Sequence, residues 1–250
     1  MTRRLTTLTA CAATAVAAAG LTALALSASA RADKVAVPDA LREQVRQVIM
    51  DNPEIIIEAL DAFEQRRERE AEGAQKEAIG ANMDALWSLP GLHVAGNPTG
   101  KIKMVEFFDY RCGFCKQAMP SVIEMIEENK DLAVAFVEFP ILSPESVTAS
   151  KAAIAAGFQD RYFDMHRALM KASGSLNEAR IMAIASNLGL DTKRLKKDMA
   201  SEKTDTIVQA HRDMATTLRV NGTPSFIIGS EPVTGWREDM VRHLLAEAKP

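Results

Sequence analysis

The chain has 250 residues, of which 25% are charged, and a formal net charge of −3 at pH 7. A chain of this length can bury a full hydrophobic core without disulfide cross-links. Because basic residues are not in excess, the composition argues against nucleic acid or an anionic membrane surface as a partner.

The first 32 residues have the pattern of a cleavable export signal. Arg3 and Arg4 precede a stretch of almost only Ala, Leu, Val, Gly and Thr, and residues 30–32 fit a small-x-small cleavage site. We therefore expect an exported protein whose mature chain begins near Asp33. An uncleaved membrane anchor is the alternative, although the stretch is weakly hydrophobic for a stable span. Cleavage removes three of the 30 basic side chains and none of the 33 acidic ones, so the mature net charge is about −6.

Residues 33–63 predict two short helices that carry more apolar surface than the segment can bury internally. Apolar residues recur at helical spacing from Leu41 to Ile49, and Asn52-Pro53 then ends one helix and starts another. The second helix is rich in large apolar side chains: Ile55, Ile56, Ile57, Leu60 and Phe63. We expect this segment to be an oligomerisation segment, and docking on the main domain is the alternative.

Residues 64–90 predict a helical linker. From Glu64 to Lys76 opposite charges lie close together and no apolar stripe is present, which is typical of a solvated helix. We expect this connector to be interrupted at Gly73 and to have no core of its own.

Residues 91–250 predict an α/β domain. A buried strand at 103–108, a helix to about Asn129 and a second strand at 132–137 have the spacing of a right-handed β-α-β crossover. Residues 144–218 predict only helices, and strands return at 225–228 and 232–233 before a closing helix at 237–247. This order is typical of a thioredoxin-like sheet with an inserted helical subdomain.

The first strand leads directly into a pair of cysteines, Cys112 and Cys115, at the start of a helix. The unpaired N–H groups of a helix N-terminus stabilise a thiolate, whose pKa can fall from about 8.5 to roughly 3.5–7.5. We expect Cys112 to be the partly exposed nucleophile and Cys115, one turn deeper, to be the resolving thiol.

Two structural interpretations of the cysteine pair are open: half of a zinc site, or an inert bridge. Zinc requires about four N or S ligands, whereas the only other cysteine, Cys11, lies in the predicted signal and the four histidines are scattered. We therefore expect no metal and no cofactor.

Three segments in chain order resemble the DsbA family of bacterial thiol–disulfide oxidoreductases. Residues 105–115 (VEFFDYRCGFC) resemble its active-site segment, 162–169 (YFDMHRAL) its helical insert, and 220–226 (VNGTPSF) its cis-proline loop. The resemblance covers roughly residues 100–249. The helical extension is similar to that of the ScsC-like branch, which includes trimeric disulfide isomerases, and this implies a homo-oligomer with a trimer favoured.

Strand alternation points Glu106 into the sheet interior, where a buried carboxylate of raised pKa can take the proton of Cys115. An outward-facing Glu106 is the alternative, and the family keeps an acid at the matching place. We expect a cis bond between Thr223 and Pro224 that leaves the backbone of residue 223 free to pair with an extended client. A trans proline that opens a strand is the alternative. We expect His166 to be a packing or surface residue.

Gly113 and Phe114 separate the cysteines and add neither charge nor a side-chain hydrogen bond, and Phe114 is a candidate client contact. Strongly oxidising DsbA proteins carry a histidine at the second position, so we expect a less oxidising pair here. A Gly-aromatic dipeptide is closer to the Cys-Gly-Tyr-Cys of DsbC-type isomerases.

The resemblance implies thiol–disulfide exchange on unfolded or misfolded exported proteins. We expect an isomerase or reductase that a membrane redox partner keeps reduced. A DsbA-like dithiol oxidase is one alternative. A periplasmic holdase chaperone with an incidental dithiol is another.

Overall fold

The computed structural model describes residues 37–248 and divides the chain into two units, with a boundary after Phe63. The predicted signal peptide, its cleavage site and the mature start at Asp33 lie outside the described residues. We describe the two units separately.

The N-terminal unit contains two helices, as the sequence predicts. Helix α2 (Asp39–Asp51) ends where expected, and α3 (Glu54–Trp87) begins after Asn52 and Pro53. None of the residues of α2 is buried. Apart from the half-buried Ile49, the large apolar side chains that the structure describes in this unit are exposed, including Ile57 at 63% and Leu60 at 55%.

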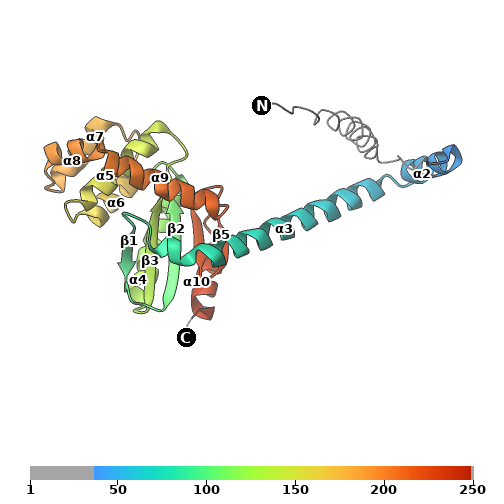
Figure 1. Ribbon diagram of the computed structural model, residues 1–250, viewed down its shortest axis with the longest axis horizontal. Helices are drawn as coiled ribbons and strands as arrows, with labels where there is room; N and C mark the ends of the chain where they lie inside the picture. The colour runs from blue at the N-terminus through green and yellow to red at the C-terminus, as the bar shows by residue number, and fades with distance from the viewer. Residues whose placement is uncertain (1–36, 249–250) are drawn as a thin grey trace, which may run out of the picture. The chain divides into compact units, whose positions relative to one another are not determined.

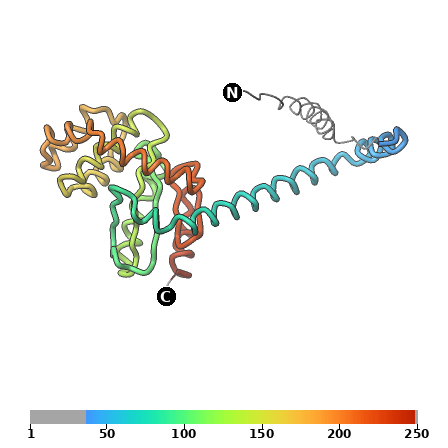
Figure 2. Tube along the Cα trace, viewed as in Figure 1, coloured from blue at the N-terminus to red at the C-terminus, as the bar shows by residue number. Residues whose placement is uncertain are grey.

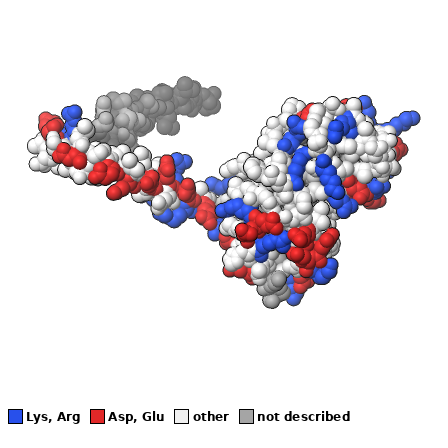
Figure 3. Space-filling view, turned by 180° about the vertical axis from the view of Figure 1, so that it is seen from behind, with Lys and Arg blue, Asp and Glu red and all other residues white. Residues whose placement is uncertain are grey.

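Helix α3 is continuous through Gly73, so the predicted interruption is wrong. One glycine in a helix costs only about 1 kcal/mol relative to alanine, and the neighbouring Arg, Glu and Ala residues favour a helix. Acidic and basic side chains both occur along its exposed stretch (Figure 3). The charge pattern therefore predicted the solvated surface correctly but not the length of the helix.

The last turns of α3 belong to the core of the second unit. Ile79 and Leu86 are fully buried, and Gln75 donates hydrogen bonds to the carbonyls of Leu218 and Arg219. The prediction of a connector without core contacts is therefore wrong for this part. A spacing of seven residues between Ile79 and Leu86 puts both on one helical face. Two apolar residues form only a narrow stripe, which is a weak indication of burial.

The second unit is built on a five-stranded sheet in the order β1-β3-β2-β4-β5 (Figure 1). The central pair, β2 (Ile102–Phe108) and β3 (Leu132–Glu138), is parallel and joined by α4 (Gly113–Glu128). The other pairings are antiparallel, with β4 (Ser225–Ile228) beside β2 and β5 (Glu231–Thr234) at one edge. The sequence predicted these elements, but not the four-residue edge strand β1 (His93–Gly96), whose half-buried residues carry a weak pattern.

Between β3 and β4 the chain forms only helices, as predicted, and there are five of them. They are α5 (Pro144–Gly157), α6 (Tyr162–Lys171), α7 (Glu178–Asn187), α8 (Thr192–Met199) and α9 (Glu202–Thr217). The chain then returns to the sheet and closes with α10 (Glu238–Glu247), as its trace shows (Figure 2).

Alternate residues of the central strands are buried on opposite faces of the sheet. Met104 and Phe108 of β2 pack in a cluster with α4, α10 and the helical insert. Val105 and Phe107 pack on the other face with the ends of α3 and α9. Because both faces are covered, β2 and β3 read as nearly continuous apolar runs. This arrangement holds the carboxyl end of β2 beside the first turn of α4.

Candidate active site

Cys112 lies between the end of β2 and the first residue of α4, where it is the N-cap residue. Its pKa is lowered to about 5, chiefly because the Cys115 thiol hydrogen-bonds to the thiolate. The backbone N–H groups of Cys115 and Phe114 and the side chain of Thr223 add to this effect, while burial opposes it. Cys112 is 6% exposed, which is less than the sequence suggested.

Cys115 lies one turn into α4 and is completely buried. Burial raises the pKa of its thiol far above the ordinary value, and the hydrogen bond to Cys112 and the charge of Glu106 act in the same direction. No disulfide joins Cys112 and Cys115 in this structure. One acidic thiol beside one strongly protected thiol is the asymmetry that a nucleophile and a resolving group require.

The loop before β4 contacts the nucleophile. The peptide bond between Thr223 and Pro224 is cis, as predicted. The Cys112 thiol donates to the Thr223 carbonyl, with Sγ and O 3.2 Å apart. The Thr223 hydroxyl is buried and has no hydrogen-bond partner within residues 37–248, so it is available to donate to the Cys112 thiolate.

Glu106 is 2% exposed and lies on the sheet face that α4 covers, so the interior placement is confirmed. Burial raises its pKa to about 8, and the negative charge of Cys112 contributes. Since the charge of Glu106 also raises the pKa of Cys115, a proton lost by the Cys115 thiol is electrostatically coupled to this carboxylate. A buried carboxyl group of raised pKa whose charge acts on the Cys115 thiol has the character expected of an acid–base partner.

Phe114 lies between the two cysteines and is 62% exposed. A bulky aromatic ring that reaches solvent beside a nucleophile is available to contact a client chain. Ile141 and Leu142, in the loop after β3, are further exposed apolar residues of this unit. In contrast, His166 is buried, as a packing residue should be. In the part of the chain that the structure describes, no group of three or more Cys, His, Asp or Glu residues is arranged to hold a metal.

A family model described as a DSBA-like thioredoxin domain matches residues 103–246, from β2 into α10. The chain belongs to this family. The match includes both cysteines, the helical insert and the cis-proline loop. It thus confirms the predicted thioredoxin-like fold and the predicted resemblance to the DsbA family.

Solved structures that are similar to this chain cover more of it than the matched DSBA-like domain does. A thioredoxin-like oxidoreductase from Silicibacter pomeroyi is 36% identical, with a TM-score of 0.63 over 66% of this chain and 96% of that one. A linker-deletion variant of ScsC from Proteus mirabilis is 26% identical, with a TM-score of 0.64 over 88% of this chain and 98% of that one. The second match covers more of the chain than the family domain alone.

Curated relatives match a shorter stretch. The Na+/H+ antiporter NhaA 1 of Salinispora arenicola is 30% identical over 138 residues, which is 54% of this chain and 21% of the antiporter. The chain thus spans about a fifth of the length of these relatives. Within residues 37–248 no helix has both the length and the apolar character needed to cross a bilayer.

Sequence reasoning missed Asp109, which organises the segment that precedes the nucleophile in this DSBA-like domain. We call this segment, residues 109–112, the redox loop. Its buried carboxylate accepts the backbone N–H of Arg111 at 2.7 Å and those of Ile141 and Leu142 at 2.9 and 3.0 Å. It therefore joins the loop before Cys112 to the loop after β3. An aspartate directly after a buried strand, at the start of a turn, was the available signal.

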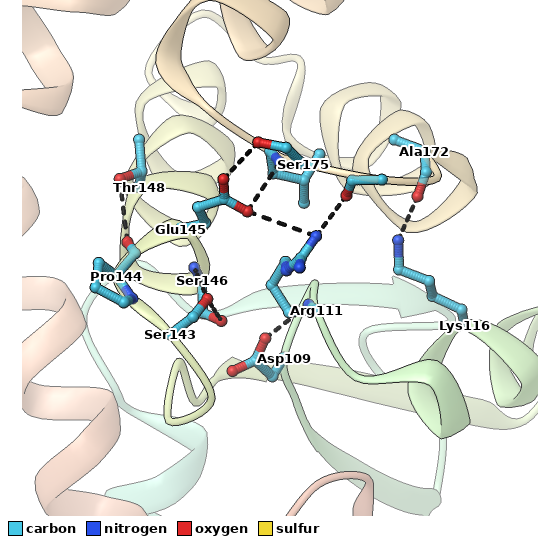
Figure 4. A network of polar contacts seen from close by, with 12 residues as sticks. Asp109, Arg111, Lys116, Ser143, Pro144, Glu145, Ser146, Thr148, Ala172 and Ser175 are labelled. Carbon is cyan, nitrogen blue, oxygen red and sulfur yellow. Dashed lines mark hydrogen bonds and ion pairs between the residues drawn. The ribbon is translucent and has the colours of Figure 1, made fainter.

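The residues that flank the cysteine motif hold the loop between α6 and α7 (Figure 4). Arg111 donates to the carbonyl of Gly174, and Lys116 donates to that of Ala172. Glu145, in the first turn of α5, forms a 3.5 Å ion pair with Arg111 and accepts a hydrogen bond from Ser175. These contacts, which the sequence did not reveal, attach the helical insert to the redox loop on both sides of the dithiol.

Proposed function

We propose that the protein is an exported thiol–disulfide oxidoreductase that acts on unfolded or misfolded proteins in the periplasm, as a disulfide isomerase or reductase. The observation that carries this proposal is the asymmetry of the dithiol. Cys112 has a lowered pKa of about 5, whereas burial raises the pKa of Cys115. At neutral pH such a pair presents one reactive thiolate and one thiol held in reserve.

The reaction begins when the Cys112 thiolate attacks one sulfur of a client disulfide. A mixed disulfide forms, and the other client sulfur leaves as a thiolate. In isomerisation, a different client thiolate attacks the mixed disulfide, forms a new client disulfide and returns Cys112 as a thiolate, so no net electrons move.

In reduction, Cys115 resolves the mixed disulfide. Its proton passes to Glu106 in the ionised form, which the mixed disulfide favours because it removes the Cys112 charge that helps raise the pKa of Glu106. The Cys115 sulfur then attacks Cys112, and the client leaves as a thiolate. The client disulfide gains two electrons and the enzyme is left with a Cys112–Cys115 disulfide. A membrane redox partner must then supply two electrons to restore the dithiol.

The residues between the cysteines support an isomerase or reductase over a strong oxidase. Gly113 and Phe114 place no charged or hydrogen-bonding side chain beside the thiolate. A pKa of about 5 for Cys112 lies between the values of about 3.5 for a strongly oxidising DsbA and about 7 for thioredoxin. A less oxidising disulfide lets the reduced, attacking form persist.

The N-terminal unit supports a homo-oligomer, with a trimer favoured by the family resemblance. Its exposed apolar side chains lie on α2 and on the first turns of α3. They include Leu41, Val45, Val48, Ile55, Ile56, Ile57 and Leu60. Surface of this kind is stable in water when other apolar surface covers it. Several active sites on one assembly raise the effective concentration of thiolates around one client, which favours isomerisation.

The test compares two forms of ribonuclease as client. We expect the reduced protein to restore activity to scrambled ribonuclease, and equilibration with a glutathione series to give a potential less oxidising than that of a DsbA oxidase. Rapid oxidation of reduced ribonuclease, with scrambled ribonuclease left unchanged, would instead establish the oxidase alternative.

The exposed apolar surface of residues 41–63 also favours a second candidate, a holdase chaperone. A holdase keeps its activity without the dithiol. If a Cys112→Ser, Cys115→Ser double variant still suppresses aggregation of an unfolded client as well as the parent does, the chaperone function stands beside or in place of the redox one.

A further inference from the structure

Glu138 is a fully buried carboxyl group that the exchange steps do not use. It ends β3, and its register partner across the sheet is Phe108, the last residue of β2. Its Oε1 accepts two hydrogen bonds, from the Tyr110 hydroxyl at 3.0 Å and from the Tyr162 hydroxyl at 2.8 Å. Tyr110 lies two residues before Cys112 in the redox loop, whereas Tyr162 opens α6 in the insert.

Burial favours the neutral acid form of Glu138, and two unpartnered atoms are compatible with that form. Within the described chain, Glu138 Oε2 and the Ser150 hydroxyl are both buried without a hydrogen-bond partner. Burial raises the pKa of Glu138 to about 8 and outweighs hydrogen bonding by the Ser150, Tyr162 and Tyr110 hydroxyls, which lowers it. A proton on Oε2 supplies a donor for the Ser150 oxygen, so protonation of Glu138 satisfies both atoms at once.

Tyr110 is held on more than one side. It is completely buried, its ring contacts Phe108 edge to face at 5.2 Å, and its hydroxyl lies 3.1 Å from Nδ1 of His166. Since the tyrosine proton goes to Glu138, His166 Nδ1 donates to the tyrosine oxygen. Burial lowers the pKa of His166 to about 3, so this histidine is neutral.

The remaining polar neighbours of Glu138 come from two other elements. His211 of α9 accepts the backbone N–H of Glu138 at 3.1 Å. Asp109, whose backbone carbonyl accepts the N–H of Cys112 at 3.0 Å, adds a negative charge that helps keep Glu138 protonated. A residue next to Tyr110 thus holds both the redox loop and the N-cap cysteine.

We propose that Glu138 is a positioning residue for the exchange reaction: as a neutral acid it fixes the Tyr110 hydroxyl and, through Tyr110, the loop that sets Cys112 at the start of α4. The proposal rests on Cys112 being the nucleophile of the proposed function. Loss of the anchor lets the loop relax, and the N–H groups of α4 and the Thr223 side chain then stabilise the thiolate less.

The two tyrosines provide a matched test, because they donate to the same oxygen from different elements. The measurement is the rate of iodoacetamide alkylation of Cys112 in the full mature protein as a function of pH. We expect Tyr110→Phe to raise the midpoint of this profile by about 0.5 to 1 pH unit, that is, a roughly three- to tenfold loss of thiolate below the midpoint. Tyr162→Phe should lower thermal stability comparably and leave the midpoint unchanged. Equal midpoint shifts in both variants, or none in Tyr110→Phe, would overturn the proposal.

The protonation state has its own test. Glu138→Gln keeps a carbonyl acceptor for the tyrosines and an N–H donor for Ser150, so we expect the parental midpoint, whereas Glu138→Leu should shift it as Tyr110→Phe does. A shifted midpoint in Glu138→Gln contradicts a neutral Glu138. If Glu138→Leu does not fold, the tyrosine pair decides. Alkylation needs no client. If the midpoint shifts appear as expected but the parent does not rescue scrambled ribonuclease, the proposed function is contradicted and the role of Glu138 is not.

Discussion

The two units of this chain carry similar apolar runs but expose them very differently. In the N-terminal unit, the run from Ile55 to Ile57 is exposed, with Ile57 at 63%. In the second unit, the run that ends at Phe107 and Phe108 is completely buried. Apolar residues in a row therefore do not by themselves define a core.

The difference arises from what the rest of the chain supplies. A strand presents its residues alternately to two faces, and β2 has helices packed on both faces and a paired strand along each edge. Among the residues that the structure describes, none of α2 is buried. The second unit is complete in itself, and we expect the N-terminal unit to need a partner.

The largest expected effect is on the chemistry, which we assign to the second unit alone. Cys112→Ser should abolish disulfide exchange, because an alcohol is not ionised near neutral pH and cannot replace the thiolate. Insulin reduction measures this loss. Cys115→Ser is the matched control: it keeps the nucleophile, so a mixed disulfide with the client should accumulate on non-reducing gels. Exchange that survives in Cys112→Ser would remove Cys112 from the mechanism.

Deletion of residues 33–63 is expected to separate the two units by function. Without the exposed apolar helices, the mature protein should be a monomer by light scattering. It should still reduce insulin, since the dithiol and its loops are unchanged, but lose rescue of scrambled ribonuclease. A mature full-length protein that is already monomeric contradicts the assembly half of this prediction.

Single truncations should distinguish a buried run from an exposed one. Phe107→Ala leaves a cavity beside Phe139 in the core, so the free energy of unfolding should fall by about 3–5 kcal/mol. Ile57→Ala should leave the stability of the second unit unchanged and weaken self-association instead. Urea unfolding and sedimentation measure the two effects. A large loss of stability in Ile57→Ala would show that the N-terminal unit docks on the second.

The smallest expected effect is the pH dependence contributed by Glu106. Its folded pKa of about 8 exceeds the ordinary value, so between the two values the folded protein holds a proton that the unfolded chain releases. Glu106 therefore stabilises the fold fully below its ordinary pKa, and this contribution disappears as pH rises through 8. Relative to Glu106→Gln, the free energy of unfolding of the parent should fall by about 1.4 kcal/mol per pH unit across this window.

Parallel urea-unfolding curves of the two proteins from pH 5 to 8 measure this difference. A difference that does not change with pH contradicts the burial of Glu106.

Most of the second unit was predictable because its signals are local. Buried parallel strands read as apolar runs. The cysteine motif, the Gly-Thr-Pro loop and the helical block are each recognisable from a short stretch of sequence. The edge strand β1 was not predictable, since its four half-buried residues show no clear alternation. The burial of Ile79 and Leu86 was also missed. Two apolar residues in a charged helix do not indicate which surface they pack against, and the fold alone brings that surface near.

The sequence by itself determined which residues are candidates for the chemistry: two cysteines at a helix start, a glutamate inside a strand and a proline loop. These follow from residue type and short spacing. Only the tertiary structure decided which groups modify that chemistry. Glu138, Tyr162 and Thr223 lie from 26 to 111 residues beyond Cys112 in the chain, and they meet the redox loop only because β3, α6 and the cis-proline loop converge there. Hydrogen bonds and desolvation act over a few ångströms, so distance along the chain cannot reveal them.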